Sequence, residues 1–206
     1  MPGHIFLEGT DVALRVIEQT DRDHTILGWV RNNPAFRHSL GFNAPWPRSK
    51  VQEFVESIIA DESSINFFIC LCDEECSQDR QVNISESKGT ELKHFGVDAS
   101  IAGTVNLFDV DDTSGTLSYW LFKTHRGNGY ATEAVSLLLE YAFNERGLHR
   151  VDAEVFEGNN SSERLLDRFG FVHEGTARDA HFTRGEFRDT YQFGLLAPEW
   201  ADREEL

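Results

Sequence analysis

A glycine-rich turn constrains this chain more than any other feature of the sequence. The residues Arg126-Gly127-Asn128-Gly129-Tyr130-Ala131 follow a segment, 115–122, that is predicted to be a strand, and apolar residues then recur at helical spacing as far as Phe143. Glycines at the start of a helix let backbone N–H groups approach a ligand, and the helix dipole adds positive potential there. Arg126 adds a permanent charge with a planar donor fork that suits phosphate. The turn therefore predicts a phosphate site, although an isolated Gly-x-Gly with a solvated arginine is also compatible with a tight connection.

Alternating and helical periodicities elsewhere predict a mixture of strands and helices. Strands are expected at 12–16, 65–72, 101–107, 115–122, 149–156 and 190–196, with a short extended piece at 171–172. Helices are expected from Thr20-Asp21 toward Val30, from a capping box of Ser49 and Gln52 through Ile59, from Ala131 to a C-cap at Gly147, and from about Ser161 to Phe169. Mostly antiparallel strands with a few packed helices make an α+β, or mixed α/β, domain.

The length of 206 residues fits one domain that spans 1–206. Within it, the segment 73–100 is polar and mixed in charge, which predicts a flexible hairpin insertion between two strands. No stretch approaches the roughly 20 apolar residues that a membrane span needs, and the N-terminus lacks the basic start and apolar core of a secretory signal. We therefore expect a cytoplasmic protein that does not enter a membrane.

The net charge of −16 narrows the class of partner. It argues against nucleic acid, whose phosphates carry the same sign, and it favours cationic partners such as amines or basic peptides. The same acidic composition also suits a protein that is solvated in concentrated salt, and the sequence leaves both explanations open. Cys70, Cys72 and Cys76 are odd in number and have no second cluster at metal-ligand spacing, so they predict reduced thiols and no metal site.

Several motifs around the glycine-rich turn share a known order. The turn fits the pattern of Arg or Gln, two residues, Gly, one residue, then Gly or Ala, and it is followed by Tyr141-Ala142-Phe143, Gly147-Leu148-His149-Arg150-Val151, Asn159-Asn160-Ser161-Ser162, and Phe169-Gly170-Phe171 with Glu174-Gly175. From Gly103 to Asp189 the chain thereby resembles the GNAT acyltransferase superfamily, in particular its RimJ/RimL-type branch of N-acetyltransferases. The resemblance implies a GNAT-like fold, with a central, mostly antiparallel twisted sheet flanked by helices. The segment 73–100 is not part of the common pattern.

The resemblance also implies the ligands and the residues that hold them. Acetyl-CoA is implied as co-substrate, without a metal, and a backbone N–H in the region 120–122 is implied as the donor to the reaction's oxyanion. The implied cofactor-binding residues are Leu121, Phe122, Arg126, Gly127, Asn128, Gly129, Tyr130, Ala131, Asn159 and Ser162.

Two residues are candidates for catalysis. Ser162 is implied as the proton donor to the departing thiolate, although the run 159–162 is also a good helix cap. Where the ribosomal-protein acetyltransferases are thought to use a carboxylate as base, four residues before Gly185, this chain has His181. A histidine accepts a proton near neutral pH, so His181 is the candidate base, against the alternative of a surface or substrate-lining residue. Glu174 is a weaker candidate.

These observations predict an N-acetyltransferase that moves an acetyl group from acetyl-CoA to a primary amine, of either a protein N-terminus or a small molecule. The departure at His181 leaves open an alternative, a protein that binds acyl-CoA as a sensor, or a protein partner, without turnover. A nucleotide-binding site does not fit, because no Lys-Ser or Lys-Thr follows the glycines. By resemblance, a homodimer through the C-terminal strand region is also expected.

Overall fold

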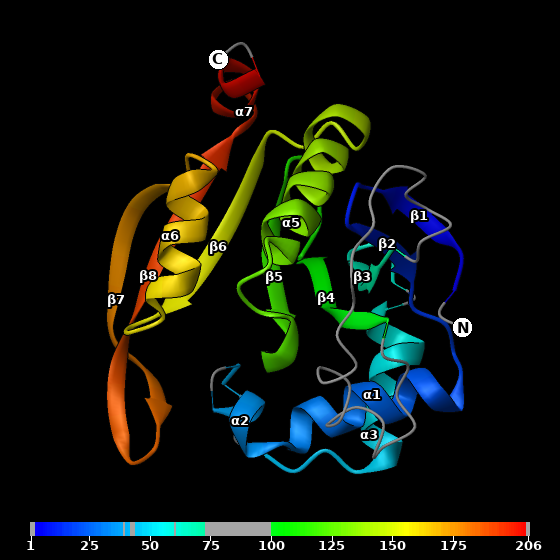
Figure 1. Cartoon of the computed structure of the whole chain (residues 1–206). Coiled ribbons are helices and arrows are strands. Elements are labelled where there is room, and N and C mark those ends of the chain that lie inside the picture. Colours follow the sequence, from blue (N-terminus) through cyan, green and yellow to red (C-terminus); the bar gives the residue numbers. More distant parts are fainter. Residues whose placement is uncertain (1–2, 39, 42–43, 60, 73–99, 205–206) are drawn as a thin grey trace.

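One twisted sheet of eight strands runs through the chain, in the order β1-β2-β3-β4-β5-β6-β8-β7 (Figure 1). The computed structural model describes residues 3–38, 40–41, 44–59, 61–72 and 100–204. The predicted insertion at 73–100 lies, except for Ser100, outside the described residues. The strands are β1 (Ile5–Glu8), β2 (Val12–Val16), β3 (Ile65–Leu71), β4 (Ile101–Phe108), β5 (Ser114–Leu121), β6 (Arg150–Phe156), β7 (Val172–Thr183) and β8 (Glu186–Leu196).

All but one of the strand pairs in this sheet are antiparallel. The exception is the pair of β5 and β6, which run parallel because a helix connects them. β8 then pairs antiparallel with both β6 and β7, so the chain ends in a long hairpin. The sheet therefore confirms the prediction of a mostly antiparallel α+β architecture.

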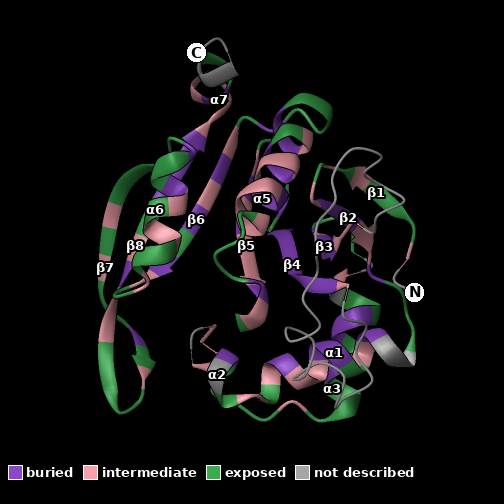
Figure 2. Cartoon of the chain, in the orientation of Figure 1, coloured by how far each residue is buried: buried purple, intermediate pink, exposed green. Residues whose placement is uncertain are grey.

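Helices cover both faces of the sheet and divide the core in two. They are α1 (Asp21–Asn32), α2 (Pro34–Arg37), α3 (Arg48–Phe54) with a π-helical turn (Val55–Ile59), α5 (Tyr130–Glu140) with a second π-helical turn (Tyr141–Glu145), α6 (Asn160–Arg168) and α7 (Ala197–Glu204). β3 is buried on both faces, because Phe67 and Ile69 join the cluster under α5 while Phe68 and Cys70 join the cluster under α1 and α3. Figure 2 shows β4, in the middle of the sheet, buried along most of its length.

Helix α5 is the element that fixes the glycine-rich turn in space. Its apolar face contacts β2, β4 and β5, and Ala134, Val135, Leu138 and Leu139 are fully buried there. Burying one such leucine side chain contributes about 1.5–3 kcal/mol. The start of the helix, and the turn before it, are therefore held rigidly against the end of β5.

Several predicted boundaries differ from the structure. The capping box at Ser49 is wrong, because the residue before α3 is Pro47 and no side chain caps the helix there. The last strand begins at Glu186 rather than at Thr190, and its partner β7 extends over 12 residues instead of the short piece at 171–172. Most side chains of this hairpin are exposed on both faces in its outer half, so they lack the apolar alternation on which strand prediction depends.

None of the helices in the described part of the chain has the length and apolarity to cross a membrane. β7 forms one edge of the sheet. A homodimer through this region stays a prediction.

Candidate functional site

The two parallel strands in the middle of the sheet separate before they end. Pairing between β5 and β6 covers only Ser114 to Leu117 on β5, and beyond it the strands diverge (Figure 1). Phe122 N–H donates to Ala102 O on the opposite side of β5 (2.9 Å). Because N–H groups alternate in direction along a strand, those of Tyr119 and Leu121 point away from β4, toward the side on which β6 diverges from β5. The separation therefore exposes backbone donors without a strand partner.

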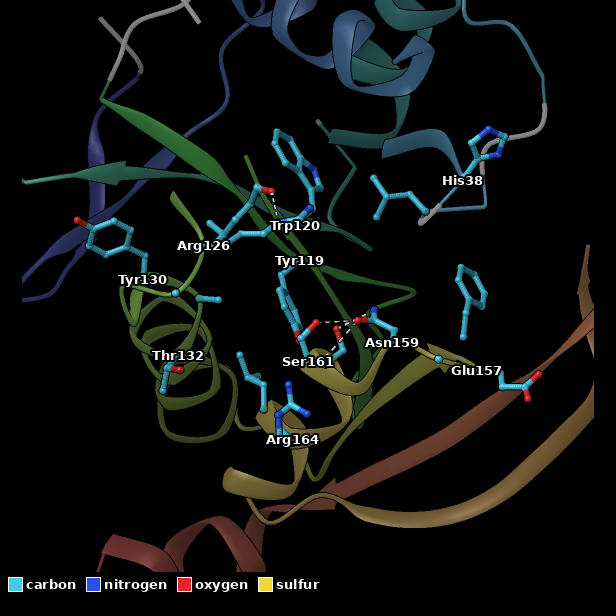
Figure 3. A pocket seen from close by; sticks show the side chains of 18 of the residues that line it. His38, Tyr119, Trp120, Arg126, Tyr130, Thr132, Glu157, Asn159, Ser161 and Arg164 are labelled. Atoms are coloured by element: carbon cyan, nitrogen blue, oxygen red, sulfur yellow. Dashed lines mark hydrogen bonds between the residues drawn. The ribbon is translucent and has the colours of Figure 1, made fainter. Parts of the chain in front are cut away.

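A cleft of about 680 Å³ occupies this separation and continues to the glycine-rich turn. Its walls come from β5, the turn and start of α5, the end of β6, α6, the β7–β8 hairpin and the segment after α2. The lining residues include Tyr119, Trp120, Leu121, Arg126, Gly127, Gly129, Tyr130, Ala131, Thr132, Asn159, Ser161 and Ser162 (Figure 3). A cleft of this size is large enough for a cofactor-sized ligand.

The two glycines give the turn its backbone conformation and leave open space beside it. Gly127 and Gly129 have φ angles of 80° and 87°, a left-handed backbone that other residues adopt only with strain. A Cβ atom at either position would meet nothing within 4 Å, so the space beside both is open to a ligand. Gly129 is the N-cap of α5 and offers no side chain to the first N–H groups of the helix. Those N–H groups remain available for an anion.

The one acidic side chain in the first turn of α5 is directed away from the cleft. Glu133 accepts hydrogen bonds from the backbone N–H groups of Thr10 and Asp11, in the turn between β1 and β2. Its charge is therefore satisfied on the far side of the helix, and the cleft side keeps its positive potential.

Arginines dominate the charge of the cleft. Five of them line it, Arg126, Arg164, Arg168, Arg184 and Arg188, whereas Glu157 is the only carboxylate among those lining residues that the structure describes. Arg188 forms an ion pair with Glu186 (3.0 Å). In the described part of the chain, the other four make no ion pair, and Arg126 is fixed by a bond from its Nε to Leu121 O (3.1 Å). This local excess of positive charge is opposite in sign to the net charge of −16.

The start of α6 places Ser162 in the wall of the cleft. Asn159 is the N-cap, and its Oδ1 accepts from Ser161 Oγ (2.9 Å) and Ser162 N (3.4 Å). This fixes the amide orientation, so Asn159 Nδ2 donates to Ser162 Oγ (3.0 Å). Because Ser162 Oγ accepts from the amide, its own hydrogen is left to donate elsewhere. Ser162 is thus both part of the cap and a candidate donor.

Tyr119 lies beside Ser162 on the other wall of the cleft, and Figure 3 shows its ring directed toward the start of α6. Burial raises the pKa of its phenol, and the Ser162 side chain partly offsets that effect. The Tyr119 hydroxyl makes no hydrogen bond of normal geometry within the described chain. Its raised pKa keeps the hydroxyl protonated, and therefore able to donate, at neutral pH.

His181 lines the same cleft from β7. Its ring is 8% exposed and stacks on the ring of Phe156, with 3.8 Å between centroids. A register shift between Ala177 and His181 turns the strand here. Nε2 of His181 is buried and has no hydrogen-bond partner within the described residues. A buried, unpaired ring nitrogen is costly unless a ligand or water meets it.

The structure places two of the predicted cofactor-binding residues away from the cleft. Phe122 is a correction, because its side chain packs in the cluster with Trp29 and Phe36 and its N–H is paired with β4. Asn128 also does not line the cleft, since its Nδ2 donates to His125 O and Arg126 O (both 3.2 Å) and closes the turn. Glu174 lies outside the cleft and binds Arg150 (2.9 Å). The other predicted residues line one cleft together.

Sequence reasoning did not find most of the arginines. Arg164 and Arg168 are four residues apart on α6, a spacing that puts both on one face of the helix. That spacing could have indicated, from the sequence, that the two arginines lie side by side. Arg184 and Arg188 come from the hairpin, which folds back over the cleft, and nothing in their sequence neighbourhood indicates that approach. No group of three His, Cys, Asp or Glu side chains arranged for a metal ion occurs among the described residues.

An α+β sheet whose two parallel strands separate beside a glycine-rich helix start defines the class of fold, the GNAT fold. The family model described as Acetyltransferase (GNAT) domain matches residues 11–172, and the chain belongs to this family. Among solved structures, the spermidine N-acetyltransferase from Vibrio cholerae in complex with CoA and spermine superposes with a TM-score of 0.74 at 18% identity, over 94% of this chain and 99% of that chain. At this identity the likeness confirms the fold alone.

Curated relatives match about half of the chain or less. The chain is 36% identical to the uncharacterized, SPbeta prophage-derived N-acetyltransferase YokL of Bacillus subtilis over 105 residues, which are 50% of this chain and 59% of that protein. It is 32% identical to the [ribosomal protein uS5]-alanine N-acetyltransferase of Escherichia coli over 84 residues, 41% of this chain and 43% of that protein. The chain thus spans about half the length of these relatives.

Proposed function

We propose that this protein is an acetyl-CoA-dependent N-acetyltransferase whose acceptor is a primary amine, either of a protein N-terminus or of a small molecule. The observation that carries the proposal is the local charge. Five arginines and one carboxylate line a cleft in a chain whose net charge is −16. CoA carries a pyrophosphate and a further phosphate, which such a lining complements. Membership of the GNAT acetyltransferase family supports the same ligand.

In this proposal the pyrophosphate binds the N–H groups of the turn at Gly127 and Gly129, together with Arg126. Arg164 and Arg168 lie on the wall opposite the turn and bind the remaining phosphate. The pantetheine arm then extends between β5 and β6, where one of its amides takes, in place of a neighbouring strand, whichever of the Tyr119 and Leu121 N–H groups does not bind the oxyanion. This geometry brings the thioester to the start of α6.

The acceptor nitrogen attacks the thioester carbon, and the carbonyl oxygen becomes an oxyanion. The Leu121 N–H, or that of Tyr119, donates to this oxygen, a contribution of about 2.7–4 kcal/mol where such donors are preorganised. The C–S bond then breaks, the acetyl group stays on nitrogen, and the thiolate takes the proton of Ser162 Oγ. Tyr119, still protonated, returns a proton to Ser162; the cycle closes when His181 releases the proton of the amine to solvent and Tyr119 regains one from solvent.

The amine must lose a proton before or during attack. His181 accepts it at Nε2, directly or through one water, because His181 lines the cleft and its buried Nε2 has no partner among the described residues. Stacking on Phe156 holds the ring in a fixed orientation. The other described lining residues that could act as a base are His38 and Glu157, and Glu157 Oε2 already accepts from the Asp189 N–H (3.4 Å).

Calorimetric titration with acetyl-CoA and with CoA tests the ligand first, at low and at high salt. Thiol release with a panel of amines then tests turnover. His181→Gln is expected to lower turnover by about 10²–10⁴-fold with acetyl-CoA affinity unchanged, as befits a general base. His173→Gln, on the exposed part of the same strand, is the matched control. Absence of acetyl-CoA binding in either salt would refute the proposal, and binding without turnover on any amine would favour a sensor.

A further inference from the structure

A second, smaller pocket lies behind Trp120, on the face of the sheet that α1 and α3 cover. It has a volume of about 160 Å³, and two residues, Leu40 and Trp120, line both it and the main cleft. The two cavities are therefore neighbours that share a wall. The smaller one is below the roughly 300 Å³ at which pockets for drug-sized ligands begin, so it suits a small molecule or a single residue.

The floor of this rear pocket is a row of polar side chains across the sheet. Asn66 on β3 pairs with Asn106 on β4, and Asn106 pairs with Ser118 on β5, so the three occupy one register line. Thr104 stands in the next row. The surrounding cluster on this face is apolar, with Phe68, Cys70 and Ile101. Polar groups in such a setting need partners, and a ligand site is one reason to keep them.

The hydrogen bonds of the floor leave the amide oxygens to the pocket. Asn66 Nδ2 donates to Ser64 Oγ (2.7 Å), and Asn106 Nδ2 donates to Thr104 Oγ1 (3.1 Å) and to Ser118 O (3.3 Å). No donor from the described part of the chain reaches Oδ1 of either asparagine. Each oxygen is therefore a ready acceptor for an N–H group.

The wall of the pocket carries a cation. The guanidinium of Arg31, on α1, lies 3.9 Å from the ring centroid of Trp46 and 4.0 Å from that of Phe54. These rings hold the planar group in one orientation. Burial lowers the pKa of Arg31 to about 10, so the side chain stays charged at neutral pH. A desolvated guanidinium binds a carboxylate more strongly than an exposed one does, and it repels a second cation.

Cation and amide oxygens together complement a molecule that carries both an anion and N–H donors. We propose that the rear pocket binds the acceptor, and that this acceptor is a small amine bearing a carboxylate, of the amino-acid class. Arg31 binds the carboxylate, and Asn66 and Asn106 accept from N–H groups other than the amine that attacks the thioester in the main cleft. A polyamine does not fit, because its second ammonium would meet Arg31. The inference rests on the proposed function, since it assigns the substrate of the same reaction.

Matched ligands test this directly. The twenty common amino acids and their carboxamides are titrated into the wild-type protein with CoA present, with tryptophan fluorescence as the readout, because Trp120 lines the pocket and Trp46 stacks on Arg31. Each pair differs only in the carboxylate. At least one amino acid is expected to bind about 10–100-fold more tightly than its carboxamide, the effect of charge-assisted hydrogen bonds. The same pairs, and diamines, are then compared as acceptors by thiol release.

Arg31→Gln is expected to lower the ratio of the affinity for an amino acid to that for its carboxamide to about one. Acetyl-CoA affinity should stay unchanged, because Arg31 does not line the main cleft. Arg37→Gln, on the exposed end of α2, is the control, and thermal unfolding checks that each variant folds. Arg31→Lys keeps the charge and should retain part of the preference. The inference is overturned if carboxamides, diamines or N-terminal peptides bind or react as well as amino acids, or if no amino acid binds at millimolar concentration. Acetyl-CoA binding in those cases leaves the proposed function standing.

Discussion

Replacing Arg126 tests whether the glycine-rich turn binds the phosphates. The side chain is exposed, and its Nε is bound to Leu121 O (3.1 Å), so the two terminal nitrogens remain for a ligand. One charge-assisted hydrogen bond to phosphate is worth about 1.5–3 kcal/mol, and exposure to solvent favours the lower end. Arg126→Gln should therefore weaken acetyl-CoA binding about tenfold, which corresponds to about 1.4 kcal/mol.

Arg126→Glu should have a larger effect, because it replaces an attraction by a repulsion. At about 5 Å and an effective dielectric constant of 20–80, one unit charge contributes about 1–3 kcal/mol, so reversal of the charge costs about twice that. We expect affinity to fall at least about 30-fold in low salt. The difference should shrink in 1 M salt, where the Debye length is only about 3 Å.

Isothermal calorimetry with acetyl-CoA measures both variants against the wild type. Arg178→Glu is the matched control, since it makes the same change of charge on β7, at a residue that does not line the cleft. It should alter affinity less than about twofold, because exposed charges beyond a Debye length are screened. A folded Arg126→Glu protein that binds acetyl-CoA as tightly as the wild type would refute the assignment of the turn.

Three further predictions concern catalysis, stability and pH. Ser162→Ala should lower turnover by about 10²–10⁴-fold with little change in acetyl-CoA affinity, whereas Ser161→Ala should retain turnover. Full activity of Ser162→Ala would show that Ser162 is not the proton donor and would favour Tyr119 in that role. Leu138→Ala removes a fully buried side chain under α5 and should lower the free energy of unfolding by about 2–5 kcal/mol in urea titrations. Leu137→Ala, at a half-buried position of the same helix, should lower it less. Equal losses would contradict the difference in burial between the two side chains. Asp111 accepts from the N–H groups of Thr113 and Ser114 (both 2.7 Å), which lowers the pKa of its carboxyl below the ordinary 3.8. A lowered pKa stabilises the fold above the unfolded value, and that effect is lost as pH falls through the folded value. Asp111→Asn should therefore unfold at lower urea than the wild type at pH 7, and the difference should shrink as pH falls below 3.8. A constant difference would be inconsistent with this linkage.

The sequence alone determined the local parts of the site. The spacing of apolar residues from Ala131 to Phe143 predicted a helix, and the two glycines before it predicted a turn with open backbone donors, because these properties depend on neighbours in the chain. The same holds for Asn159 and Ser162, whose cap is local. Both groups were predicted, and the mostly antiparallel sheet with them. Their roles toward acetyl-CoA remain proposals.

Only the tertiary structure determined which residues from distant parts of the chain lie together. Tyr119 and Ser162 lie 43 positions apart in the numbering yet adjoin one cleft, because β5 and β6 pair over four residues and then separate. Phe122 is next to Leu121 in the chain but packs on the opposite face, since consecutive side chains of an extended segment alternate. Arg31, Asn66 and Asn106 come together from α1, β3 and β4, and no local pattern joins them. Sequence periodicity specifies which face of an element is buried, whereas the partner of that face depends on strand order and register, which are set by packing across the whole sheet.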